Sequence, residues 1–304
     1  MSMLSIAAAV TIAFPAANQK LPFVEKAYMI GAVPRGTPTV CVQGRDVEVY
    51  RTGAWATMVD VVEGTNSIEV VCAGATSNHV FCVEAKPKPR PPSTNSVPEK
   101  VWEKLEYCAD TPKPHPTGKS PKDITIVIDP GHGGTDTGAI SPHGLFEKNA
   151  NLLQSEALRA ELVSRGYRVL MTREDDVALV LAERPRLAHA ENADAFISIH
   201  HNAPAANGNA PKARWSAVYS WNPLGERLAS SISSCLADAF AAEMDSKGSL
   251  HANFAVTRNP EIPSCLVEVD FITSPAGEES IFNHAHRLEV AIAIADGLDD
   301  WLAH

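Results

Sequence analysis

Three segments of the sequence place metal-binding side chains next to predicted strands or helices. His132 lies in a glycine-rich run that directly follows the apolar, β-branched run 124–128. His200 directly follows a second apolar run, 195–199, and Glu147 stands where a helix is predicted to begin. Two neutral imidazoles and one carboxylate hold zinc with one position left open for water, which is the arrangement of a catalytic zinc site.

Each of these residues alone also has an ordinary structural interpretation. A histidine in a glycine-rich loop can be incidental, and a histidine at a strand end is more often part of a core. A glutamate at a helix start is stabilised by the helix dipole without any metal. The combination favours the metal site, because ligands of open α/β sheets bind beyond the carboxyl ends of the strands.

Glu268 is a fourth candidate, and its expected role is catalytic. It lies inside the apolar run 265–269, where a carboxylate is costly unless it has a partner. Near a metal it would be the general base that takes a proton from water. The alternative is a buried structural carboxylate. Asp270 competes for the same role, since alternate residues of a strand share one face.

Alternating strand and helix patterns across 123–304 predict the elements that position these residues. Repeated β-α-β units imply a mostly parallel, twisted sheet with helices on both faces, which is an α/β fold. The expected strands are 124–128, 167–171, 195–199, 216–221, 254–256 and 265–269. The expected helices are 148–165, 181–191, 224–244 and 285–302.

The first part of the chain has a different character. Short alternating or β-branched runs separated by glycine-containing turns predict a small β-sandwich-like domain at 27–86. Residues 87–122 are rich in proline and are expected to form a semi-rigid linker. Residues 1–26 are expected to be a signal peptide and leader, with an apolar, uncharged segment at 4–17 but no basic residue before it. The predicted catalytic domain is 123–304.

Composition excludes some classes of function. The formal charge of −10 argues against nucleic acid as a partner, because phosphate binding needs clustered lysine and arginine. No run approaches the roughly 20 apolar residues of a membrane span. The six cysteines form no CxxC pair, which argues against a cysteine zinc site. Cys72 and Cys82 flank a turn-like segment and can pair across a hairpin, or each can be a small buried hydrophobe.

The motifs in 123–303 resemble the zinc-dependent N-acetylmuramoyl-L-alanine amidase family, specifically its amidase type 3 catalytic domain. They occur in order and with ordinary spacing. The matching positions are Asp129 to Gly134, Gly138 and Ala139, Glu147 to Asn149, Thr172 and Arg173, Arg184, Asn192 to Asp194, Ser198 to His200, Asn202 and Ala203, Val267 and Glu268, and Phe271. The segment 27–86 shows a weaker likeness to Ig-like accessory domains of bacterial surface enzymes.

The resemblance implies a phosphorylase/hydrolase-like fold and zinc-dependent hydrolysis of the bond between N-acetylmuramic acid and L-alanine in peptidoglycan. It implies zinc ligands at His132, Glu147 and His200 and a catalytic base at Glu268. The substrate implies an exported protein, periplasmic or extracellular, and we expect a monomer. His201 departs from the family, which usually has a small residue there, but no expected ligand or base is missing.

Two alternatives stay open at this point. One is a wall-binding regulator with the same fold and no turnover. The other is a different zinc amidohydrolase or peptidase, although the pattern His-x-x-Glu of zinc carboxypeptidases does not fit, because Thr135 occupies the third place after His132. Division-associated members of the family carry an inserted helix that blocks the zinc. The segment between His200 and Glu268 leaves no room for one, so we expect an open site.

Overall fold

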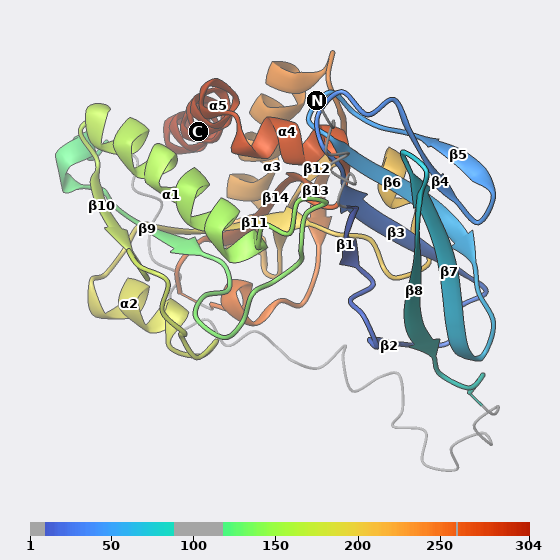
Figure 1. Ribbon diagram of the computed structural model, residues 1–304. Helices are drawn as coiled ribbons and strands as arrows, with labels where there is room; N and C mark the ends of the chain where they lie inside the picture. Colours follow the sequence, from blue (N-terminus) through green and yellow to red (C-terminus); the bar gives the residue numbers. More distant parts are fainter. Residues whose placement is uncertain (1–9, 88–117, 260) are drawn as a thin grey trace, which may run out of the picture.

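The protein has a strand-rich N-terminal part and an α/β C-terminal part, seen at the right and left of Figure 1. This computed structural model describes residues 10–87, 118–259 and 261–304. The N-terminal part has a three-stranded sheet in the order β1-β3-β6 and a five-stranded sheet in the order β2-β8-β7-β4-β5. The strands are β1 (Thr11–Phe14), β2 (Lys20–Leu21), β3 (Lys26–Ala32), β4 (Thr39–Val42), β5 (Arg45–Glu48), β6 (Ala54–Asp60), β7 (Gly64–Cys72) and β8 (Ala75–Val83).

The two N-terminal sheets bury one shared core that includes Trp55, Val70 and Phe81. Strand β7 alternates exposed and buried residues along most of its length, as a strand with one face on a core must. Strand β1 lies in the segment expected to be a leader, and it pairs antiparallel with β3. Strand β2 lies in the same segment and pairs parallel with β8, so part of the expected leader belongs to the two sheets.

Of the two interpretations of Cys72 and Cys82, the structure contradicts the disulfide pairing. Strands β7 and β8 do form a hairpin, but its turn is so tight that Cys72 pairs with Ala75. Cys82 lies seven residues further along β8, where its partner across the hairpin is Thr65. Both cysteines carry free thiols, and Cys72 is buried.

The C-terminal part confirms the predicted α/β class. Its six-stranded sheet has the order β10-β9-β11-β14-β12-β13. The first four strands are parallel, whereas β12 runs antiparallel to β14 and carries β13 alongside it in parallel. The strands are β9 (Thr125–Pro130), β10 (Arg168–Met171), β11 (Ala195–Asn202), β12 (Trp215–Ser220), β13 (Asp245–His251) and β14 (Ser264–Phe271).

Helices cover both faces of this sheet (Figure 1). On one face, α1 (Glu147–Ser164), α3 (Pro223–Phe240) and α5 (His284–Ala303) bury the larger core with Leu158, Ile232 and Ile294. On the other face, α2 (Arg184–Ala190) and the 3-10 helix η4 (Ala255–Thr257) bury Ala188 and Val256 against the sheet. Within the described part of the chain, no helix combines the length and apolarity needed to cross a membrane.

Three elements differ from the prediction. The run 254–256 was expected to be a strand but enters η4, where Val256 is buried against α2 while Phe254 stays partly exposed. Strand β13 was not predicted, because it is a largely polar edge strand. Helix α4 (Pro275–Phe282) was also missed, although Ser274 caps its N-terminus by accepting a hydrogen bond from the Gly277 amide.

The N-terminal part contacts the C-terminal part through the segment 203–214, which links β11 to β12. The amide of Tyr28 donates to the carbonyl of Ala206 at 3.0 Å. Ala210, in the 3-10 helix η3 (Ala210–Lys212), packs in a cluster with Tyr28 and Ile30. On the other side, His143 Nε2 lies 3.2 Å from the carbonyl of Thr52.

Candidate metal centre

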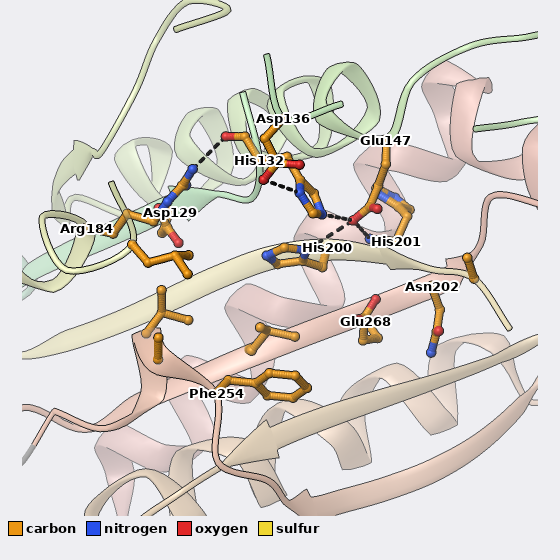
Figure 2. A pocket seen from close by; sticks show the side chains of 15 residues that line it. Asp129, His132, Asp136, Glu147, Arg184, His200, His201, Asn202, Phe254 and Glu268 are labelled. Atoms are coloured by element: carbon orange, nitrogen blue, oxygen red, sulfur yellow. Dashed lines mark hydrogen bonds and ion pairs between the residues drawn. The ribbon is translucent and has the colours of Figure 1, made fainter. Parts of the chain in front are cut away.

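The three expected ligands meet at the carboxyl ends of β9 and β11. Oε1 of Glu147 lies 3.1 Å from Nε2 of His132 and 3.0 Å from Nδ1 of His200, as the dashed lines in Figure 2 show. One ligand atom from each residue lies within 4.8 Å of the other two. His132 follows β9, Glu147 begins α1 and His200 lies near the end of β11. The topology therefore brings together three residues that are far apart in the sequence.

The donor set fits zinc. A tetrahedral zinc with bonds of about 2.0–2.1 Å separates its ligand atoms by roughly 3.3 Å, close to the two nitrogen–oxygen distances observed here. Asp136 Oδ2 accepts a hydrogen bond from Nδ1 of His132 at 2.9 Å. With a metal bound, this hydrogen bond would keep the remaining His132 proton on Nδ1 and leave Nε2 as the ligand atom, as outer partners of metal-binding histidines do.

The charges of the three residues depend on one another. Burial alone would raise the pKa of Glu147, but hydrogen bonds and charge interactions with His132 and His200 hold it well below its usual value. Burial would lower the pKa of His132, but the carboxylates of Glu147 and Asp136 raise it to about 9. Glu147 is thus ionised as a ligand must be.

Two buried arginines hold the loop that carries His132. Arg184 donates to the carbonyl of His132 at 2.7 Å and pairs with Asp129 at 2.9 Å. Arg173 donates to the carbonyls of Pro130 and Gly131 at 2.9 and 2.8 Å. The loop needs this support, because His132 adopts a φ of 60°, which is uncommon for a residue with a side chain.

Asn151 supports Glu147, and the sequence reasoning missed it. Its side-chain amide lies 3.2 Å from Oε1 of Glu147 and 3.2 Å from the carbonyl of Gly131. Its own oxygen lies 2.8 Å from Nδ1 of His201. His201 is fully buried, and burial lowers its pKa to about 3, so it is a neutral supporting group behind the ligands. The sequence does offer one indication of this role: Asn151 follows Glu147 by four residues, and residues four apart share a helix face.

Glu268 lies on β14 directly opposite His200 on β11, and its carboxyl group points toward that imidazole in Figure 2. Its Oε2 is buried and has no hydrogen-bond partner among the described residues. Burial raises its pKa to about 7, although the neighbouring histidines act in the opposite direction. Asp270, the competing carboxylate, instead accepts a hydrogen bond from Arg214 at 3.0 Å.

The ligands and Glu268 line one pocket of about 470 Å³. Leu181 and Phe254 add apolar surface at its mouth, and both are partly exposed. Between His200 and Glu268, the described residues form only η3, β12, α3, β13 and η4 besides the two flanking strands, so no additional long helix covers the centre. A pocket of this size with a few convergent polar groups is typical of a small-molecule or catalytic site.

Adding a methyl group at Gly138 is expected to weaken metal binding by about 10–100-fold, the range for disturbed outer contacts. A Cβ there would lie 2.5 Å from Oε2 of Glu147 and 2.7 Å from Cδ2 of His132. Gly144 is the matched control, because its φ of 79° is also positive and a Cβ would meet nothing within 4 Å. Both changes to alanine should cost about 1–2 kcal/mol of backbone strain.

Calorimetric metal titration and thermal unfolding of the two variants separate these effects. Only Gly138→Ala should change metal affinity, whereas both should lower the unfolding temperature. Equal metal affinity in Gly138→Ala and Gly144→Ala would show that the contact with Glu147 does not shape the centre.

Comparison with known proteins identifies relatives of the α/β part. Residues 126–300 match a protein-family model described as N-acetylmuramoyl-L-alanine amidase. The uncharacterized protein YqiI of Bacillus subtilis is 32% identical over 204 residues, which is 66% of this chain and 97% of that protein. The N-acetylmuramoyl-L-alanine amidase AmiC of Neisseria meningitidis is 31% identical over 63% of this chain, and the match spans 56% of AmiC.

Solved structures of amidases are also similar to the α/β part. The amidase AmiC2 of Nostoc punctiforme aligns with a TM-score of 0.56 and 32% identity, covering 61% of this chain and 100% of that one. An N-acetylmuramoyl-L-alanine amidase from Clostridium difficile aligns with a TM-score of 0.55 and 32% identity, covering 59% of this chain and 96% of that one. The shared region is confined to roughly three fifths of the chain.

Proposed function

The chain belongs to the N-acetylmuramoyl-L-alanine amidase family, and from this premise we propose that it hydrolyses the amide bond between N-acetylmuramic acid and L-alanine in peptidoglycan. We assign zinc as its metal, held by His132, Glu147 and His200, and Glu268 as its catalytic base. One observation carries the proposal: a His-Glu-His ligand set lines the same pocket as Glu268, whose buried Oε2 has no hydrogen-bond partner among the described residues.

When bound, zinc would polarise the scissile carbonyl and acidify a water molecule. Glu268 takes the proton of the attacking water and returns it to the L-alanine nitrogen as the C–N bond breaks. A pKa near 7 suits a group that must both accept and donate a proton close to neutral pH. Asp136 and Asn151 keep His132 and Glu147 oriented toward the metal throughout.

The proposal is favoured over the two alternatives. A regulator without turnover would have no use for a carboxylate beside the ligands whose buried oxygen lacks a hydrogen-bond partner in the described part of the chain, since burying such an atom is costly. Another zinc hydrolase would not be expected to share the family's motifs from one end of the α/β part to the other.

We also make proposals about the location, the domain organisation and the oligomeric state of the protein. We propose that the protein acts outside the cytoplasm, where peptidoglycan lies. We also propose a division into a β-domain, a linker at 87–122 and a catalytic domain at 123–304, with the β-domain beginning at β1 rather than at residue 27, because β1 and β2 pair with β3 and β8. We expect a monomeric enzyme.

Mass analysis of digested peptidoglycan tests the proposal. The enzyme should release stem peptides with free L-alanine amino termini and leave the glycan strands intact. Glycan fragments, or cleavage between two amino acids of the stem, would replace the amidase assignment with that of a glycosidase or a peptidase.

A further inference from the structure

A second hollow adjoins the pocket of the metal centre. It has a volume of about 400 Å³ and shares Asn202 and Ala203 with the first pocket. Trp215 and Phe271 form its aromatic part, with ring centroids 4.7 Å apart and the rings edge to face. A ligand that reaches the metal centre can therefore continue into this hollow past Asn202, which lies at the far right of the pocket in Figure 2.

The charged side chains at this hollow are positive. Lys212 is the charged residue among those that line it, and its side chain is exposed. A second ammonium group, Nζ of Lys247 on β13, lies 6.0 Å from the centre of the Trp215 ring. The nearby carboxylate of Asp270 is buried and paired with Arg214, which satisfies its charge within the protein. The hollow is therefore suited to a ligand that carries carboxylates.

The walls of the hollow are held in place from both sides. Arg214 binds Asp270 and also donates to Oγ of Ser280 at 3.1 Å. On the N-terminal side, Ala210 packs against Tyr28 and Ile30 of β3. A segment fixed in this way loses little conformational freedom when a ligand binds, which favours binding.

We propose that this hollow binds the stem peptide of the substrate, with Trp215 packing on the peptide and Lys212 facing a peptide carboxylate. This inference rests on the proposed amidase function. The scissile amide separates two chemically different halves, because the stem peptide carries several carboxylates and the glycan is mostly neutral. At the other end of the pocket, beside Leu181, the lining cation is Arg184, which is buried and already paired with Asp129. The hollow then fixes the direction in which the substrate lies across the metal.

Binding of a product tripeptide tests the proposal without any turnover. The ligands are L-alanyl-D-glutamyl-diaminopimelate with its carboxyl groups free and the same tripeptide fully amidated, each titrated into the native protein by calorimetry. The native protein should prefer the free acid by about threefold to fivefold, as an exposed ion pair allows. Lys212→Glu should reverse that preference, whereas Trp215→Ala should weaken binding of both tripeptides.

Lys122→Glu is the matched control, because Lys122 is exposed and lies in the 3-10 helix η2 (Pro121–Asp123), before β9 and away from the carboxyl ends of the strands. It makes the same change of charge and should keep the native preference. If Lys212→Glu kept the native preference, the proposal would be overturned, even with normal cleavage of peptidoglycan. If tripeptide binding followed the expected pattern while peptidoglycan stayed intact, only the amidase function would fail.

Discussion

Replacing Glu268 with glutamine is expected to lower peptidoglycan turnover by about 10²–10⁴-fold while the zinc content stays native, because a positioned general base contributes that much to a rate. Glutamine keeps the size of the side chain but cannot accept the proton of water. Glu268 is not one of the three residues whose ligand atoms converge, so its loss should spare the metal. Release of free L-alanine amino termini measures the rate, and atomic absorption measures the zinc.

The control for this variant is Glu226→Gln on the exposed surface of α3, which removes one negative charge far from the pocket residues. It should digest peptidoglycan at the native rate. A Glu268→Gln enzyme that also worked at the native rate, with its zinc in place, would show that another group takes the proton.

Replacing Glu147 with alanine is expected to have the largest effect on the metal. Oε1 of Glu147 lies within 3.1 Å of both imidazole nitrogens, so its removal takes away one ligand and leaves the two histidines unbridged. Zinc affinity should fall by more than the roughly 10–100-fold that follows the loss of an outer hydrogen-bond partner.

Asp136→Asn is the comparison variant, in which a smaller loss of zinc affinity is expected. Asp136 contacts His132 but is not one of the three converging ligands, so zinc affinity should fall only within the range of about 10–100-fold. Competition with a zinc-binding dye measures both affinities. Equal losses in the two variants would contradict the assignment of Glu147 as a ligand.

Much of the candidate site was predictable because residues that follow parallel strands in the sequence lie together at one edge of the sheet. His132 follows a buried strand and His200 lies near the end of another, and neighbouring parallel strands end at the same edge. Glu268 was predictable for a similar reason, since a glutamate inside a buried strand must face something that compensates its cost. The order of strands and helices is enough to predict these positions.

The supports of the site were not predictable in the same way. Asn151 and Arg173 act through contacts with the loop carbonyls and with Glu147, and the direction of a carbonyl is known only from the folded backbone. The hollow at Trp215 depends on the segment 203–214, whose conformation is fixed by packing against β3. Edge strand β13 was missed because its polar residues lack the apolar pattern that reveals a buried strand.

Returning zinc to metal-free protein tests whether His132, Glu147 and His200 form a zinc amidase centre. The enzyme is stripped with a chelator and dialysed, then titrated with zinc while bound metal and release of L-alanine amino termini are followed together. We predict no release without metal and a linear rise that ends at one zinc per chain. Full activity in the metal-free protein, or activity that does not follow bound zinc, would contradict the account.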